Sequence, residues 1–102
     1  MYGFRFEWDE AKNLANQRKH GVSFQLASQV FLDMLFVSLK ERIQDGEQRW
    51  QTYGEVEGSL LVMVAHTIRE EDVHGTTKEV ICIISARYAS RKERRIYEDE
   101  NG

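Results

Sequence analysis

The sequence contains no proline and only one cysteine, Cys82, among its 102 residues. One thiol excludes an internal disulfide framework, and its apolar neighbours predict a buried structural cysteine. Without a proline-rich, repeated or low-complexity tract there is no linker, so we expect one domain over residues 1–102. No apolar run approaches the length of a membrane span, and the first residues lack the order of a signal peptide. We therefore expect a cytoplasmic protein without membrane contact.

Basic residues are fewer than acidic ones: the sequence has 14 Lys and Arg and 17 Asp and Glu, which gives a net charge of −3. This balance excludes a uniformly basic nucleic-acid binder. The basic residues are unevenly spread, because residues 87–97 hold five of them and a single acid, a local charge of +4. Contents of 41% hydrophobic and 30% charged residues are typical of a globular protein.

The first third of the chain predicts a short strand followed by two helices. Alternation over residues 2–7 favours an edge strand. Asp9 is a suitable N-cap for a helix over about residues 10–18, which Gly21 ends. Ser23 begins a second helix, in which one apolar stripe recurs at helical spacing: Phe24, Ala27, Val30 and Phe31.

The rest of the chain predicts strands and a closing helix. We expect strands over 35–39, 49–53, 60–65 and 80–85, with a turn at 54–58 and a polar stretch at 69–78. The last two strands are apolar on both faces, which places them at the sheet centre under at least one helical layer. Ser90 and Glu93 form a capping box for a final helix to about residue 100. The predicted fold is α+β, with two N-terminal helices, an antiparallel sheet of about four strands and a C-terminal helix.

The basic segment 87–97 is the densest chemical signal. Guanidinium groups bind phosphate through a planar fork and stay charged at every relevant pH. Basic residues at the start of a helix also oppose its dipole, which favours a bound anion there. Two interpretations stay open: a phosphate-binding surface, or a solvated helix face balanced by the acids at 98–100. Helical spacing also predicts pairing of Arg91, Arg94 and Arg95 with Glu98.

Other candidate sites are sparse. Lys19 and His20 lie before Gly21, where a histidine more often serves the helix end than catalysis. His66 and His74 lack metal-ligand spacing, and the acids show no metal-binding motif. We therefore expect no metal site and no cofactor.

Short motifs spread over nearly the whole chain carry a family resemblance. In the first half they are residues 6–9 (Phe-Glu-Trp-Asp), Lys12, Asn16, 19–24 (Lys-His-Gly-Val-Ser-Phe), Ala27 and 30–31. In the second half they are Glu47, Arg49, 53–54 (Tyr-Gly), 61–64, Thr67, Arg69, 83–87 (Ile-Ile-Ser-Ala-Arg), Glu93, Arg94, Tyr97 and Glu98. In combination, these motifs resemble the BrnT-type toxins.

The resemblance implies a RelE-like fold and a small ribonuclease toxin of a bacterial type II toxin–antitoxin pair. Such a toxin cuts RNA without a metal, stops translation and is neutralised by a BrnA-like antitoxin. That antitoxin carries a ribbon-helix-helix part, so operator DNA is expected to be bound only through the complex. Matching positions imply Arg87 and Arg69 as phosphate clamps, Lys19 and His20 as a proton-transfer or phosphate-contact pair, and Tyr97 as a further catalytic candidate. With a ribonuclease implied, we expect RNA contacts at Arg91, Arg94 and Arg49.

Strand geometry separates the two clamps. If residues 60–67 and 79–86 form a hairpin, Arg69 lies at its loop end and Arg87 at its open end, roughly 25 Å or more apart. One phosphate cannot reach both. We therefore expect two clusters, Glu47 with Arg49 and Arg69, and Arg87 with Arg91 and Arg94. One binds RNA, and the other supports the fold or meets the antitoxin.

Two other functions compete with RNA cleavage. Without the resemblance, a non-catalytic module that binds a partner and nucleic acid through residues 87–95 ranks first, because no complete acid–base constellation is visible. A metal-dependent nuclease would need a ligand motif that the sequence lacks.

Overall fold

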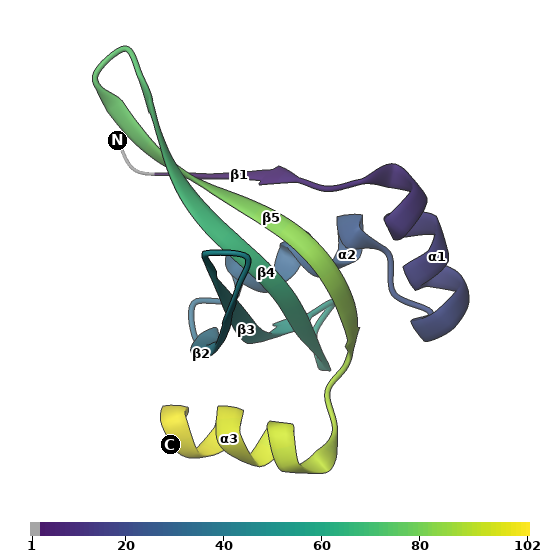
Figure 1. Ribbon diagram of the computed structural model, residues 1–102. Coiled ribbons are helices and arrows are strands. Elements are labelled where there is room, and N and C mark those ends of the chain that lie inside the picture. Colours follow the sequence, from purple (N-terminus) through teal and green to yellow (C-terminus); the bar gives the residue numbers. More distant parts are fainter. Residues whose placement is uncertain (1–2) are drawn as a thin grey trace.

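The computed structural model describes residues 3–102 as an α+β fold, in which helices lie on both faces of one sheet (Figure 1). The elements follow the order β1 (Gly3–Glu7), α1 (Glu10–His20), α2 (Phe24–Ser28), the 3-10 turn η1 (Gln29–Leu32), β2 (Val37–Gln44), β3 (Glu47–Val56), β4 (Leu60–Val73), β5 (Thr76–Tyr88) and α3 (Arg91–Asn101). The two N-terminal helices and the C-terminal helix agree with the prediction.

The sheet differs from the predicted antiparallel sheet of about four strands. It has five strands in the order β1-β5-β4-β3-β2, and β1 pairs with β5 in parallel. The other three pairings are antiparallel. Strand β1 joins the sheet only by pairing with β5, whose residues come more than 70 positions later in the sequence. Helix α1 then leads the chain away from the end of β1. Tyr2, the first residue of the predicted strand, lies outside the described residues.

Local signals explain where the helices begin and end. Asp9 accepts a hydrogen bond from the Lys12 amide at 3.1 Å, and Ser23 accepts one from the Leu26 amide at 3.0 Å. Both bonds satisfy amides that have no partner inside their helix. Gly21 adopts φ +72°, the left-handed conformation that ends α1. Helix α1 thus extends to His20, two residues beyond the prediction.

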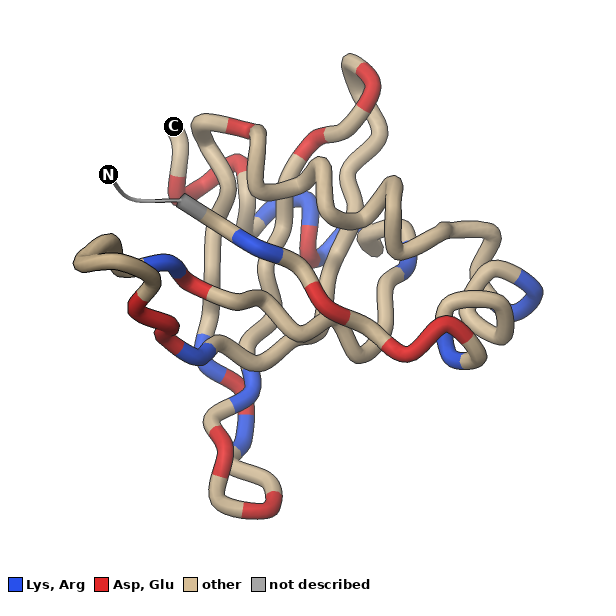
Figure 2. The backbone as a smooth tube through the Cα atoms, turned by 90° about the horizontal axis from the view of Figure 1, so that it is seen from above, with Lys and Arg blue, Asp and Glu red and all other residues tan. Residues whose placement is uncertain are grey.

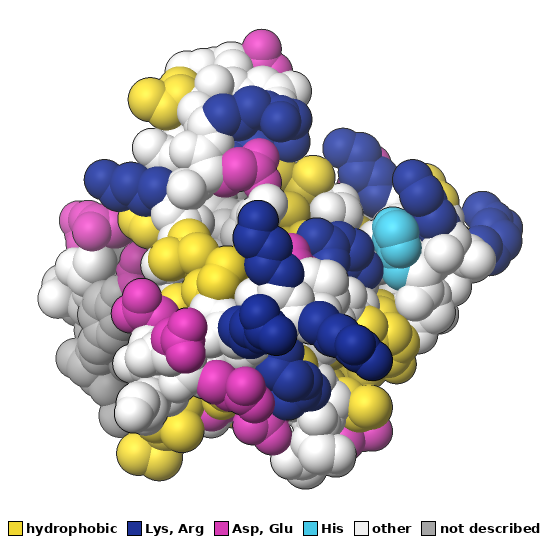
Figure 3. All heavy atoms as spheres, turned by 90° about the horizontal axis from the view of Figure 1, so that it is seen from below, with side chains coloured by type: hydrophobic (Ala, Val, Ile, Leu, Met, Phe, Trp, Pro, Cys, Tyr) yellow, Lys and Arg dark blue, Asp and Glu magenta, His cyan; other side chains and the backbone are white. Residues whose placement is uncertain are grey.

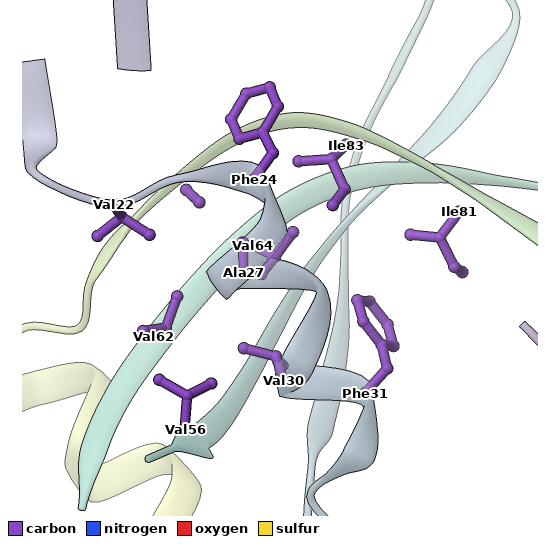
Figure 4. Packing of buried hydrophobic residues seen from close by; sticks show 11 residues of the cluster. Val22, Phe24, Ala27, Val30, Phe31, Val56, Val62, Val64, Ile81 and Ile83 are labelled. Atoms are coloured by element: carbon purple, nitrogen blue, oxygen red, sulfur yellow. The ribbon is translucent and has the colours of Figure 1, made fainter. Parts of the chain in front are cut away.

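The main core lies between the sheet and the segment formed by α2 and η1 (Figure 4). All four residues of the predicted apolar stripe are buried there, against Val62, Val64, Ile81 and Ile83 of the central strands. On the opposite face, Tyr97 of α3 packs against Tyr53, Leu61 and Met63. Helix α3 therefore covers only one end of the second face.

The polar stretch 69–78 is strand rather than loop. Strands β4 and β5 pair as far as Val73 and Thr76, and their hairpin projects from the sheet (Figure 1). The turn itself consists of His74 and Gly75, both at positive φ. Beyond the core there is no buried face, so these strands lack the apolar alternation that marks the central ones.

Gly54 lies inside β3, not in the predicted turn at residues 54–58. A Cβ atom at this position would meet the side chain and the carbonyl oxygen of Val30 at 2.8 Å. Glycine is therefore required by the close approach of η1 to the sheet. The turn begins three residues later, at Glu57. Cys82, predicted to be buried, is partly exposed.

Candidate active site

Arg87 is held at the end of β5 by a two-pronged ion pair with Glu93 of α3. Its Nη1 and Nη2 donate to the two carboxylate oxygens at 2.7 and 2.8 Å. These hydrogen bonds are the main cause that lowers the pKa of Glu93 and raises the pKa of Arg87. Glu93 also accepts from the Ser90 amide at 2.9 Å, which completes the predicted capping box. The Arg87 side chain remains 37% exposed, so a phosphate from solvent can reach it.

Helix α1 is docked directly beside Arg87. The Asn16 side-chain amide donates to the Ala86 carbonyl at 2.8 Å and accepts from the Ala86 amide at 3.2 Å. It also donates to the Val22 carbonyl at 2.8 Å. His20 lies four residues after Asn16 and therefore on the same side of α1. The structure thus docks α1 at the residue before Arg87, and Lys19 and His20 follow Asn16 by three and four residues on this helix.

The first half of α3 supplies exposed positive charge beside this point. Its basic side chains are Arg91, Lys92, Arg94 and Arg95, and all four are exposed. Within residues 3–102 no ion pair involves them, so the predicted pairing with Glu98 is not found. Arg94 donates only to the Ser59 carbonyl, at 3.4 Å. Seen from the α3 side, basic side chains gather over the middle of the surface and continue toward α1 (Figure 3).

Arg69 belongs to a separate charge network with β1. It donates to both carboxylate oxygens of Glu7 at 2.9 Å, while Arg5 bonds Glu71 at 2.7 Å and contacts Glu7 at 3.1 Å. The hydrogen bonds from Arg69 are the main cause that lowers the pKa of Glu7. Both signs of charge lie close together where β1 runs beside the projecting hairpin (Figure 2). The acid beside Arg69 is therefore Glu7, not the predicted Glu47.

Strand register sets the distance between the two predicted clamps. Arg87 pairs with Met63, six residues before Arg69 on β4, which corresponds to roughly 20 Å along the strand. The predicted separation is thus retained, although it is somewhat shorter. Alternation along β3 and β4 places Arg49, Arg69 and Met63 on the same sheet face, the one that α3 partly covers. The structure therefore brings these arginines to one face but not to one point.

Tyr97 is buried rather than open to a substrate. Its hydroxyl donates to Asp33 Oδ2 at 2.6 Å, and Asp33 also accepts from the Glu55 and Leu35 amides. Burial, followed by the bond to Asp33, raises the pKa of Tyr97 above its usual range. This contact ties α3 to the segment after η1. Sequence reasoning missed it, because 64 residues separate the two partners.

Two further polar contacts were not expected from the sequence. Asn13 is buried one turn before Asn16 and accepts from the Phe24 amide at 2.8 Å. His66 is buried under Phe31, with Nε2 2.6 Å from the Thr52 hydroxyl. The sequence offered one signal for the Asn13 contact. Asn13 and Asn16 are three residues apart, on one side of a helix that has no apolar stripe.

No group of three His, Cys, Asp or Glu side chains in residues 3–102 is arranged to hold a metal ion. None of the helices there is long and apolar enough to cross a membrane.

Comparison with known proteins gives the family. The family model described as "Ribonuclease toxin, BrnT, of type II toxin-antitoxin system" matches residues 8–93. The crystal structure of the Brucella abortus ribonuclease toxin BrnT, at 1.1 Å resolution, superimposes with a TM-score of 0.54 at 25% identity. That match covers 89% of this chain and 100% of the Brucella chain. No curated protein sequence matches. The chain therefore belongs to the BrnT family of ribonuclease toxins of type II toxin–antitoxin systems.

Proposed function

We propose that this toxin cleaves RNA without a metal ion, inhibits translation in the cytoplasm and is neutralised by a BrnA-like ribbon-helix-helix antitoxin. Operator DNA is bound only through that complex, and the fold is RelE-like. The observation that carries the proposal is the position of Arg87. It lies at the end of β5, next to the residue on which α1 docks, partly exposed and beside the exposed basic side chains of α3.

Arg87 is suited to stabilise the transition state of RNA cleavage. The attacking group is the ribose 2′-hydroxyl: its oxygen forms a bond to phosphorus while the bond from phosphorus to the 5′ oxygen breaks. Negative charge grows on the phosphoryl oxygens in between, and a guanidinium with fixed donors stabilises it. Because Glu93 holds Arg87 in place before substrate arrives, little reorganisation is needed.

Two proton transfers complete the reaction. The 2′-hydroxyl gives up its proton, and the departing 5′ oxygen receives one. We assign Lys19 and His20 to this work or to the adjacent phosphate contacts, because α1 is docked at Ala86 with His20 on the docked side. An imidazole exchanges protons near neutral pH, which fits such a role.

The remaining candidates take other roles in this proposal. Arg91 and Arg94 hold the RNA backbone near Arg87, which makes binding sensitive to salt. Arg49 extends that contact along the sheet face. Arg69 stabilises the pairing of β1 through its network with Glu7. Tyr97 is a positioning residue that fixes α3, because its hydroxyl is buried against Asp33.

The test is cleavage of a purified RNA by the antitoxin-free chain, with and without a chelator, beside Arg87→Ala and the matched variant Arg69→Ala. We expect chelator-resistant cleavage that falls at least about 100-fold in Arg87→Ala. Arg69→Ala should retain cleavage within about threefold. Far-ultraviolet circular dichroism verifies that each variant is folded.

Three results would contradict the proposal. Cleavage abolished by the chelator would indicate a metal-dependent nuclease. Equal loss in both folded variants would remove the distinction between the two arginines. Salt-sensitive RNA binding without cleavage, on free RNA and on translating ribosomes, would indicate the non-catalytic binding module instead.

A further inference from the structure

The end of η1 and the segment after it expose three apolar side chains in four residues. Leu32 is 80% exposed, Met34 97% and Leu35 54%. Leu32 and Leu35 border a hollow of about 380 Å³, whose floor includes Val56 and Tyr97, and Met34 lies on the exposed surface between them in the sequence. Contiguous exposed apolar surface of this kind marks an interaction site more often than isolated residues do.

The surroundings of this hollow are acidic. Glu55 and Glu57 line it, together with Asp33. Asn101 donates to the Leu35 carbonyl at 2.9 Å, which places the last turn of α3 beside it. That turn carries an acidic run at residues 98–100, all exposed, and the C-terminal end of a helix dipole is itself negative.

Charge is thus divided along α3. Its first half is basic and lies at Arg87, whereas its last turn is acidic and lies at the hollow. Figure 3 shows the two kinds of side chain on one surface, with acidic and apolar ones toward the side where α3 ends in Figure 1. An RNA backbone is repelled at the acidic end, so a partner there carries positive charge.

We propose that Leu32, Met34, Leu35, Glu55 and Glu57, the acidic–apolar patch, form a docking site for the antitoxin. The segment that binds carries apolar side chains, which fill the hollow, flanked by Lys or Arg, which face the two glutamates. This inference rests on the proposed function for the existence of the partner. It adds where the partner docks and which chemistry recognises it. Docking here leaves the basic end of α3 outside the contact.

The experiment measures binding of the full chain to the protein encoded by the neighbouring open reading frame. The patch variants are Met34→Ser and Glu57→Lys. Each has a matched control at the β2–β3 hairpin: Ile43→Ser also replaces an exposed apolar residue, and Asp45→Lys also reverses an acid at positive φ. Isothermal titration gives the Kd of all five proteins at low salt and at 0.5 M salt, a value chosen so that exposed charges are screened beyond about 5 Å.

We expect Kd to rise at least about tenfold in each patch variant and to stay within about twofold in the controls. High salt should weaken wild-type binding and remove most of the difference between Glu57→Lys and wild type. Unchanged affinity in both patch variants would overturn the proposal, and so would absence of binding by the wild-type chain.

RNA cleavage by each protein without antitoxin separates this inference from the proposed function. All four variants should cut RNA like the wild type, because none of the substituted residues lies in the Arg87 region. If the wild-type chain does not cut RNA but the patch variants bind the antitoxin more weakly than it does, the proposed ribonuclease mechanism is refuted. The docking site is then still supported.

Discussion

Asn16 of α1 satisfies both backbone polar groups of Ala86, the residue before Arg87. Seventy residues of sequence separate the two partners. One side-chain amide therefore fixes the distance between the helix that carries Lys19 and His20 and the strand that carries Arg87. The geometry of the candidate active site depends on this contact.

Asn16→Ala should lower the free energy of unfolding by about 3 kcal/mol. The substitution leaves two carbonyl groups and one amide without their partner, and each buried unsatisfied group costs roughly 1–3 kcal/mol before water enters. Urea unfolding followed by circular dichroism measures the change. Gln17→Ala, at an exposed position one residue later, is the control and should stay within about 0.5 kcal/mol. A loss below about 1 kcal/mol for Asn16→Ala would show that the contact contributes little.

Glu93→Gln tests whether the ion pair positions Arg87. Glutamine also completes a capping box, so the start of α3 is retained while the charge is removed. We expect RNA cleavage to fall about tenfold through kcat, and stability at pH 7 to fall by about 1 kcal/mol, a value reduced for the exposure of Arg87. Glu98→Gln, exposed on the same helix, is the control.

The stability effect of Glu93→Gln should depend on pH. The pKa of Glu93 is lowered in the folded chain, so its ion pair stabilises the protein above the ordinary pKa of 4.5. This contribution is lost as pH falls below that value, because the carboxylate must be protonated. Urea unfolding at pH 7 and pH 3.5 should therefore give a smaller difference from wild type at the lower pH. An equal difference at both would mean that charge is not the cause.

Tyr97→Phe separates a positioning role from proton transfer. The variant keeps the packing against Tyr53 and Leu61 but loses the 2.6 Å bond to Asp33. We expect a loss of about 1–2 kcal/mol in unfolding free energy and RNA cleavage within about threefold of wild type. Measured at a temperature where both proteins are fully folded, a 100-fold loss of cleavage would instead assign the hydroxyl to the chemistry.

His66 should make the fold sensitive to mild acid. Burial is the main cause that lowers its pKa from 6.5 to about 4. The unfolded chain takes up a proton near pH 6.5 and the folded chain does not, so stability is full above pH 6.5 and falls as pH decreases toward 4. The loss over this window should be roughly 3 kcal/mol. Imidazole proton shifts measured by NMR from pH 8 to pH 3.5 should show no titration of His66 until about pH 4. A midpoint near 6.5 would contradict the prediction.

The sequence predicted the helices well, since their ends depend on contacts within four residues. Asp9 and Ser23 cap α1 and α2, and Ser90 with Glu93 caps α3, as expected. The sheet was predicted less well. The parallel pairing of β1 with β5 joins residues 75 positions apart, which no local pattern reveals, and the projecting end of the β4–β5 hairpin has no apolar pattern of its own.

The candidate site was also predicted only in part. Residue types and their order indicated that Arg87 and the basic start of α3 act together, because the two are adjacent in sequence. The partner of Arg69 was mispredicted: residue spacing pointed to Glu47, whereas β1 inserts beside β5 and presents Glu7. Tyr97 was named as a catalytic candidate, and nothing nearby in the sequence revealed its bond to Asp33.

By itself, then, the sequence determined the capped helices, the apolar stripe of α2 and η1, and the local excess of positive charge in α3. Short-range hydrogen bonds and residue spacing are sufficient for these features. Only the tertiary structure decided that Asn16 docks α1 at Ala86, that β1 neutralises Arg69, and that the acidic end of α3 lies at an apolar hollow. Each of these depends on groups more than 60 residues apart, whose meeting is set by the packing of the whole sheet.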